Sequence, residues 1–576
     1  MGRWIAGGQA RAALLVLAVA AAAVGGCSSG SDNGDDPPPS SADGDDTDAE
    51  PVTTGPLSAA TEAWWAYDRP AEFETVRTGL DVDMSDGTPL DCSLLRPGLD
   101  GAPAPGEFPG LVVELTPYVQ MRSGFENEAA YFAERGYNAL VCNVRGTGES
   151  GGTWGNAMSA QDGRDAYDLV EWLATQSFSD GRIGQFGESY GGQTSYGAAV
   201  EAPPHLRAVA PLQPPASLYD DVIYPGGIKT TEGGTVDFWP GIANGLSGGR
   251  IDTAAEYATN RQHPTFDDYW AERSFAGRYD AIEVPVLTVG GWADGFFRSG
   301  TLADIEGALD RTWAIYGPWT HSAPIRFPGC TICLPDGLES GVLLAWFDRW
   351  VMELPDIPVP DEPTFVSYEG PADVGEGWRE LSHWDPTGAA PLTLALDTDL
   401  ALTPTVEAGD SGEGGGSGED SGSGEAGTVA FHQPGDPAGP GASATFTTAA
   451  LGDDQVLLGR PRLEIEATLS GDDANLYAEL LDIAPDGTIT TVNDGFLRAS
   501  HRESHVTPSP VTPGEPTTFV VEIRADHHRF AAGHRIGLRL SGGAAATVTP
   551  NATPVDVTLA TGDGASTLTL PHITGL

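Results

Sequence analysis

Four serines of this 576-residue chain lie in the pattern Gly-x-Ser-x-Gly: Ser28, Ser150, Ser189 and Ser247. This pattern can form a nucleophile elbow, in which a strand turns sharply into a helix and presents the serine hydroxyl for attack on an acyl carbon. The chain contains 76 glycines, so chance matches are expected and the flanking segments must decide between the four.

Ser189 alone has the surroundings that an elbow needs. The run 182–186 predicts a strand directly before it, and small residues after it predict a helix. Ser28 belongs to the N-terminal segment, Ser247 follows no strand, and Ser150 is separated from the nearest strand by Arg-Gly-Thr-Gly. The flanking pattern therefore selects Ser189 as the candidate nucleophile.

A serine nucleophile needs a general base and an acid that orients it, in α/β-hydrolases in the chain order Ser, Asp or Glu, His. His205 lies too close behind the elbow helix to leave room for an acid on a later strand, and His263 follows no strand. His321 lies just beyond the predicted strand 313–316. His321 is therefore the candidate base.

The candidate acid is placed in the same way as the base. Asp294 lies shortly after the predicted strand 286–289, between the nucleophile and His321 in the chain. The carboxyl ends of parallel strands meet at one edge of a sheet, where such residues can come together. The order and placement predict a triad of Ser189, Asp294 and His321, with the backbone N–H of Tyr190 as one donor to the oxyanion.

Elements that would position this triad occupy residues 58–354. Short apolar runs alternate there with helical patterns such as 162–176; the runs are 111–115, 139–144, 182–186, 286–289 and 313–316. This alternation predicts an α/β domain with a mostly parallel sheet covered by helices. Residues 212–281 interrupt the pattern with Pro, Tyr and Trp, which predicts an inserted cap.

The pattern changes in the last part of the chain, 355–576. Segments such as 463–469 and 536–540 alternate apolar and polar residues, as half-buried antiparallel strands do. Turn residues separate them, so this part is predicted to be a β-sandwich. Residues 409–427 are almost entirely Gly, Ser, Glu and Asp, which predicts a disordered insertion.

The N-terminus has the composition of an export signal. Arg3 and Arg11 precede an apolar run at 12–24 that is too short for a confident membrane span, and Cys27 follows two glycines. This ending resembles a bacterial lipobox and predicts that residues 1–27 are a lipoprotein signal, with Cys27 lipidated; an ordinary secretory signal is the alternative. Residues 28–57 predict a disordered acidic tether, so the protein is expected at the cell surface or secreted.

The charge of the chain excludes one class of function. It has 82 Asp and Glu against 29 Lys and Arg, a net charge of −53. Such a surface repels phosphate backbones and anionic lipid head groups, so no nucleic acid is expected as a partner, and membrane contact only through a lipid anchor. The acidity fits a saline habitat or a secreted protein equally well.

Four cysteines remain once Cys27 is set aside, and an even number in an exported chain favours disulfides. Cys330 and Cys333 predict a local disulfide; a redox pair or half of a zinc site are the alternatives. No second Cys pair or ordered His pair completes a metal site, so no metal is expected. Cys92 and Cys142 are candidates for a second bridge if their two strands are adjacent.

The three triad motifs together resemble a known family. The segments 187–192, 291–295 and 317–321 are similar to the triad motifs of the cocaine-esterase/Xaa-Pro dipeptidyl-peptidase (S15-like) hydrolases, and 144–148, 346–350 and 533–536 add to the likeness. The resemblance implies an α/β-hydrolase domain with a helical cap, followed by an all-β jelly-roll (galactose-binding-like) domain against the catalytic face. It also implies that the hydroxyl of Tyr118 completes the oxyanion hole.

Two residues depart from the family pattern. Asn143 stands where the family usually has an aspartate, and Glu188 where it often has a small residue. The expected function is a serine hydrolase that needs no cofactor and cleaves small acyl esters or amides through an acyl-enzyme. An Xaa-Pro dipeptidyl-peptidase acting on short peptides is the first alternative, and a non-catalytic surface protein that binds through its β-sandwich is the second.

Overall fold

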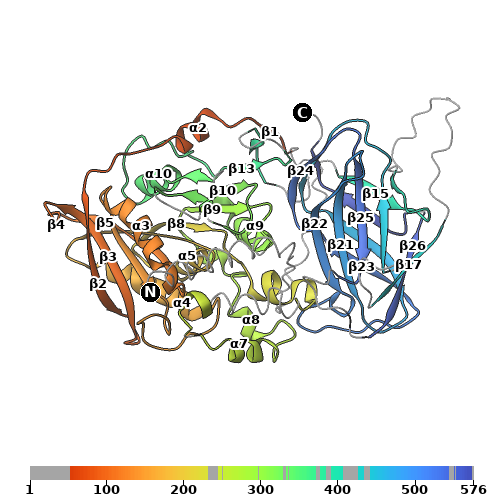
Figure 1. Ribbon diagram of the computed structural model, residues 1–576, viewed down its shortest axis with the longest axis horizontal. Coiled ribbons are helices and arrows are strands. Elements are labelled where there is room, and N and C mark those ends of the chain that lie inside the picture. Colours follow the sequence, from red (N-terminus) through yellow and green to blue (C-terminus); the bar gives the residue numbers. More distant parts are fainter. Residues whose placement is uncertain are drawn as a thin grey trace, which may run out of the picture.

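The structure of the chain is a computed structural model, shown in Figure 1. It describes residues 52–230, 244–249, 251–295, 297–322, 324–328, 333–334, 337–371, 376–384, 391–405, 426–433, 442–543, 551, 553–562 and 564–573. The predicted signal 1–27, most of the tether, most of the insertion 409–427 and Cys330 lie outside these residues. No helix in the described part of the chain is long and apolar enough to cross a membrane.

The first part of the chain is built on a 12-stranded sheet with the order β1-β14-β13-β10-β9-β8-β7-β5-β6-β3-β2 and the short β4 beside β3. Its strands are β1 (Thr54–Gly55), β2 (Glu74–Asp83), β3 (Pro89–Leu99), β4 (Ala102–Pro103), β5 (Phe108–Thr116), β6 (Asn138–Asn143), β7 (Ser179–Glu188), β8 (Leu206–Leu212), β9 (Val286–Gly291), β10 (Thr312–Gly317), β13 (Phe365–Tyr368) and β14 (Trp378–Leu381). Neighbours from β6 through β13 in this order pair in parallel. The predicted α/β fold class is confirmed.

Helices pack on this sheet around a large apolar core. They are α2 (Ala59–Trp65), α3 (Arg122–Ala133), α4 (Ala160–Ala174), α5 (Tyr190–Glu201), α9 (Arg298–Gly307) and α10 (Gly341–Trp350). The amphipathic pattern of α4 explains its place, because Ala166, Leu169, Val170 and Leu173 share one buried face. A small pair of strands, β11 (Ile325–Arg326) and β12 (Leu338–Glu339), lies between β10 and α10 in the chain.

Short helices follow β8 in the region predicted as a cap. They are η3 (Tyr219–Ile223), η4 (Pro225–Gly227), α7 (Thr253–Asn260), α8 (Asp268–Ala271) and η5 (Tyr279–Ala281). No strand lies among the described residues between β8 and β9. The insertion therefore leaves the register of the parallel sheet undisturbed, because Val209 of β8 pairs directly with Val286 of β9.

The last part of the chain is all β and has its own core. Its sheets have the orders β16-β15-β27-β20-β26-β17 with β23 on β20, β18-β25-β21-β22, and β24-β19-β28. The strands are β15 (Leu392–Leu396), β16 (Leu402–Pro404), β17 (Gly427–Gln433), β18 (Ser443–Thr447), β19 (Gln455–Gly459), β20 (Arg462–Leu469), β21 (Asn475–Ile483), β22 (Ile489–Arg498), β23 (Pro516–Glu522), β24 (Asp526–Phe530), β25 (Arg535–Ser541), β26 (Val555–Thr561), β27 (Thr567–Leu570) and β28 (His572–Ile573). Figure 1 shows this part in blue beside the α/β part, with β24 at their border.

Three predicted boundaries need correction. The catalytic domain was expected to end at 354, yet β13 pairs with β10 and β14 pairs with β13, so the first sheet extends beyond that point. β1 pairs with β14, although its residues fall in the predicted tether 28–57. Gly427 begins β17 instead of ending the insertion 409–427. Short strand patterns do not reveal which sheet a strand joins, because the partner lies far away in the chain.

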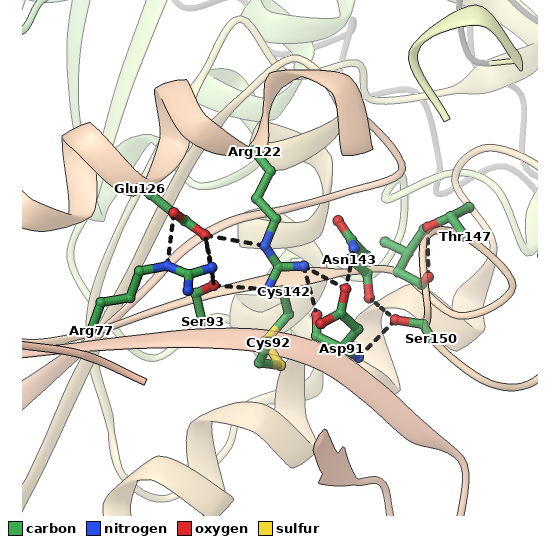
Figure 2. A network of polar contacts seen from close by, with 11 residues as sticks. Arg77, Asp91, Cys92, Ser93, Arg122, Glu126, Cys142, Asn143, Thr147 and Ser150 are labelled. Carbon is green, nitrogen blue, oxygen red and sulfur yellow. Dashed lines mark hydrogen bonds and ion pairs between the residues drawn. A yellow bond between two sulfur atoms is a disulfide. The ribbon is translucent and has the colours of Figure 1, made fainter. Parts of the chain in front are cut away.

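Cys92 on β3 lies directly opposite Cys142 on β6 in an antiparallel pair, and the two form a disulfide in the structure. The strands that carry Cys92 and Cys142 are therefore adjacent, as a bridge between them requires. Figure 2 shows the bridge beneath a polar network whose side chains come from β2, β3, α3, the end of β6 and the loop after it. The proposed pairing of Cys330 with Cys333 stays a prediction, because only Cys333 is among the described residues.

Candidate active site

A strained turn places Ser189 between β7 and α5. Its φ of 58° and ψ of −113° lie in a region that residues with a side chain rarely adopt. Neighbouring glycines make the turn possible, since a Cβ at Gly187 would come within 2.7 Å of the backbone of Gly191. A Cβ at Gly192 would come equally close, 2.7 Å, to the carbonyl oxygen of Leu212. The geometry is that of a nucleophile elbow.

Ser189, His321 and Asp294 form a continuous chain of hydrogen bonds. His321 Nε2 lies 2.9 Å from Ser189 Oγ, and His321 Nδ1 lies 2.9 Å from Asp294 Oδ2. Asp294 is fully buried. In this arrangement the imidazole can accept the serine proton, while the carboxylate fixes its tautomer.

The electrostatics of the site favour the protonated form of His321. Burial lowers its pKa, but the charge of Asp294 and the hydrogen bond to it act in the opposite direction, and the charge of Glu188 adds to them. The net effect raises the pKa of His321 above its ordinary value. A base with such a pKa takes up the serine proton readily, but it must be neutral before the reaction starts.

Backbone contacts hold the loop that carries Asp294. The N–H of Asp294 donates to the carbonyl of Gly291 at 3.0 Å, and the N–H of Ala293 donates to the carbonyl of Trp319 at 3.0 Å. The N–H of Phe297 donates to Asp294 Oδ1 at 3.1 Å. Both carboxylate oxygens of Asp294 are thus engaged, one with the backbone and one with His321.

Gln213 fixes the loop that carries His321, and sequence reasoning missed it. It follows β8, has a φ of 45° and is fully buried. Its amide donates to the carbonyl of Thr320 at 2.8 Å and accepts the N–H of Ser322 at 3.1 Å, so it holds both neighbours of His321. The sequence signal that could have indicated this role is a polar residue directly after the apolar strand β8.

Tyr118 lies beside the nucleophile, beyond the end of β5. Its side chain is buried, and its interaction with the side chain of Ser189 acts to lower its pKa, against the larger effect of burial. Burial raises the pKa of Tyr118, so the hydroxyl keeps its proton and can donate. Tyr190 is the first residue of α5, where backbone N–H groups point out of the helix N-terminus. The structure brings both predicted oxyanion donors to Ser189.

The alternative nucleophiles and bases are engaged elsewhere. The hydroxyl of Ser150 donates to the carbonyl of Asn143 at 2.9 Å and accepts the N–H of Asp91 at 2.9 Å, as Figure 2 shows. His205 Nδ1 lies 2.8 Å from Glu171 Oε2, and His263 Nδ1 lies 2.6 Å from Asp267 Oδ2. These side chains have local structural partners away from the elbow.

The departure at Asn143 is compensated by a neighbouring acid. The amide of Asn143 donates to Asp91 Oδ2 at 2.9 Å, and Arg122 Nη1 donates to the same oxygen at 2.7 Å. Asp91 lies on β3, Arg122 begins α3 and Asn143 ends β6, and Figure 2 shows the three side chains together. Asp91 therefore supplies a carboxylate to the network in which Asn143 takes part.

The departure at Glu188 adds a carboxyl group to two others under the elbow: Glu114 is buried, and Glu128 and Glu188 are half-buried. The N–H of Glu188 donates to Glu114 Oε1 at 2.7 Å. Burial raises the pKa of Glu188 to about 7 and that of Glu128 to about 8. Burial, and then repulsion from these two acids, raises the pKa of Glu114. Of these three acids, Glu188 is the one whose charge acts on His321, where it raises the pKa.

An apolar pocket adjoins the elbow. The void at its centre is about 10 Å³, and its lining residues are Ala157, Met158, Tyr190, Gln193, Pro215, Leu218, Val222 and Phe297. The ring of Phe297 also packs edge-on against His321, with centroids 4.9 Å apart. Within the described residues, no group of three or more His, Cys, Asp or Glu side chains could hold a metal ion.

The fold and the elbow define the chain as a serine hydrolase of the α/β-hydrolase class. Residues 86–323 match the family described as X-Pro dipeptidyl-peptidase (S15 family), and residues 350–569 match the X-Pro dipeptidyl-peptidase C-terminal non-catalytic domain. The chain belongs to this cocaine-esterase/Xaa-Pro dipeptidyl-peptidase family, as its motifs indicated.

Curated relatives span most of the chain. A protein named cocaine esterase, from Rhodococcus sp. (strain MB1 Bresler), is 26% identical in an alignment 537 positions long that covers 81% of this chain and 90% of the relative. A putative Xaa-Pro dipeptidyl-peptidase from Bacillus cereus is 22% identical and covers 71% of both chains.

Solved structures share the fold over nearly the whole length. A CocE/NonD family hydrolase from Staphylococcus aureus has a TM-score of 0.68 at 18% identity, covering 90% of this chain and 99% of its own. An α-amino acid ester hydrolase has a TM-score of 0.67 at 18% identity, covering 90% of this chain and 98% of its own.

The charge of Glu188 generates a prediction on pH dependence. Because that charge raises the pKa of His321, Glu188→Gln should lower it. The base is active only when neutral, so the acid limb of the kcat/KM profile should move to lower pH. The measurement is kcat/KM for an acyl ester between about pH 5 and pH 9, the range in which histidine titrates. Glu188→Asp keeps the carboxylate and should keep the limb near its wild-type position; an unmoved limb in Glu188→Gln would contradict the coupling.

Proposed function

We propose that the protein hydrolyses acyl ester or amide bonds with Ser189 as nucleophile, His321 as general base and Asp294 as the orienting acid. The observation that carries this proposal is the hydrogen-bond chain from Ser189 Oγ through His321 to Asp294, with both distances 2.9 Å. Families with this arrangement react through a covalent acyl-enzyme.

In the proposed mechanism, His321 takes the proton of Ser189 as its oxygen attacks the substrate carbonyl. The negative charge that develops on the carbonyl oxygen is stabilised by the hydroxyl of Tyr118 and the N–H of Tyr190. His321 then protonates the leaving alcohol or amine, and a water molecule, activated by the same histidine, releases the acyl group. No cofactor is required for any of these steps.

The substrate is proposed to be a small acyl ester or amide. The side chains beside the elbow, among them Phe297 and Leu218, are mostly apolar, and this favours an uncharged acyl group. The relative named cocaine esterase covers more of this chain than the putative dipeptidyl-peptidases do. An Xaa-Pro dipeptidyl-peptidase is the second candidate, supported by the name of the matching family and by those same relatives.

We also propose that the enzyme is exported and held at the cell surface. The basic residues and apolar run before Cys27 support this proposal, as does the acidic tether that follows. Globomycin treatment of expressing bacteria should block maturation if Cys27 is lipidated, and Cys27→Ala should release the enzyme from the membrane fraction. The alternative of an ordinary secretory signal predicts soluble enzyme in both cases.

Ser189→Ala should abolish turnover, because no other group in the site can form the acyl-enzyme. The measurement is side-by-side hydrolysis of a panel of p-nitrophenyl acyl esters and of Gly-Pro and Ala-Pro p-nitroanilides. The wild type should act on the esters, and the variant, shown to be folded by circular dichroism, on neither series. Retained turnover by Ser189→Ala would refute the nucleophile, whereas activity of the wild type on the Xaa-Pro amides alone would favour the second candidate.

Tyr118→Phe tests the second oxyanion donor. Removing one such donor typically costs about 10²–10³ in kcat, and the substitution keeps the ring that packs against Tyr190 with centroids 6.1 Å apart. Tyr137→Phe is a matched control, since that buried hydroxyl donates to Asp348 at 2.8 Å, away from the site. Equal kcat values for Tyr118→Phe and the wild type would remove Tyr118 from the oxyanion hole.

A further inference from the structure

We propose that strand β24 of the β-rich part positions the catalytic acid, through an ion pair between Arg298 and Asp526 and through a relay from Trp292 over Ser367 to His527. The inference rests on the proposed function, because it assigns these residues to the support of Asp294. On this proposal the β-rich part contributes to catalysis. Its residues position Asp294 and touch neither the substrate nor Ser189.

The ion pair lies directly behind the acid loop. Arg298 begins α9 and follows Phe297, whose N–H donates to Asp294 Oδ1. Arg298 Nη1 lies 3.2 Å from Asp526 Oδ2, and their side chains are only 7% and 11% exposed. The carbonyl of Arg298 accepts the hydroxyl of Tyr316 at 2.7 Å, so the same residue is also tied to β10.

A buried ion pair is more sensitive to the loss of one partner than an exposed ion pair is. Removing one partner of a buried pair leaves the other charge without compensation, and the local structure must then rearrange. A second buried pair, Arg524 with Asp494, lies close enough that its arginine repels Arg298. Asp526, Asp494 and Asp294 all offset this repulsion at Arg298. Asp526 is the one of the three in the ion pair with Arg298, so its loss should displace the start of α9.

The relay holds the other side of the acid loop. The indole N–H of Trp292 donates to Ser367 Oγ at 3.2 Å. Ser367 Oγ lies 2.7 Å from His527 Nδ1. Because an indole N–H can only donate, Ser367 accepts from Trp292 and its own hydroxyl hydrogen is left for His527. All three side chains are buried, so water does not compete for these bonds.

Backbone contacts attach β24 to the first sheet at the same place. The N–H of Gly370, two residues beyond β13, donates to the carbonyl of His527 at 2.9 Å, and Gly370 forms a parallel bridge with His528. Figure 1 shows β24 at the border of the two parts, near α9 and β13. β24 is thus joined to the sheet that carries the triad by backbone and side chains together.

The two contacts bracket Asp294. Trp292 precedes it by two residues and Arg298 follows it by four, and both end on adjacent residues of β24, Asp526 and His527. A shift of β24 would therefore move both ends of the acid loop. Misplacement by about 1 Å, even from a distant change, can cost on the order of 100-fold in rate.

The test compares kcat, KM and the pH profile of Arg298→Met, Asp526→Asn and their double variant on the best ester of the panel. Each single variant should lower kcat about 10- to 100-fold with little change in KM. The double variant should lose little more than Arg298→Met alone, because both changes break one contact. Looser contact of Asp294 with His321 should also lower the pKa of the base and move the acid limb of kcat/KM to lower pH.

A matched control lies at the other end of the same helix. Arg460 of the β-rich part pairs with Glu306 of α9 at 2.5 Å, away from Asp294. Arg460→Met breaks a contact between the same two parts, so it should lower the melting temperature while leaving kcat and the acid limb unchanged. The proposal would be overturned if Arg298→Met and Asp526→Asn had the same kcat and the same acid limb of the pH profile as the control Arg460→Met.

A milder variant tests the proposal in case the loss of a buried charge prevents the protein from folding. Ser367→Ala breaks the relay without removing a charge, and we expect it to lower kcat about three- to tenfold and to move the acid limb in the same direction. Wild-type kcat and acid limb in folded Ser367→Ala would overturn the proposal. Failure of the proposed function itself would show separately, as turnover retained by Ser189→Ala.

Discussion

The strained backbone of Ser189 is the constraint on which the site depends. A residue with a φ of 58° at a strand end persists only where its surroundings determine it fully. Here the parallel sheet fixes the end of β7 and the next helix starts at Tyr190. Glycines allow the strand and the helix to approach each other closely. The turn directs the hydroxyl outward and places the next N–H where an oxyanion would develop.

The remaining groups reach Ser189 because they follow neighbouring strands of the same sheet. Tyr118 follows β5, Gln213 follows β8, Asp294 follows β9 and His321 follows β10, all at the carboxyl ends of parallel strands. A triad assembled in this way needs rigid loops, and the structure supplies a separate restraint for each. Gln213 holds the base, while Phe297 and the contacts with β24 hold the acid. The domain described as non-catalytic in the family is therefore built into the support of the acid loop.

The parts of this arrangement that follow local patterns could be predicted from the sequence. The strand before Ser189 and the strands before Asp294 and His321 are short apolar runs, so the class of fold and the candidate triad were within reach. The support could not be predicted, because Arg298 and Asp526 are separated by 228 residues and nothing local to either one indicates the other. For the same reason the pairing of β1 and β14 with the first sheet was missed, since a strand's partner is decided by three-dimensional packing.

The central claim is that Ser189 is an activated nucleophile, and labelling by a fluorophosphonate probe tests it most directly. We expect the intact protein to gain one label, which peptide mapping by mass spectrometry should place on Ser189. Labelling should fall as the pH is lowered and His321 takes up a proton, and His321→Ala should not be labelled. A label on Ser150 or Ser247, or a folded wild-type protein that takes up no label, would contradict the account.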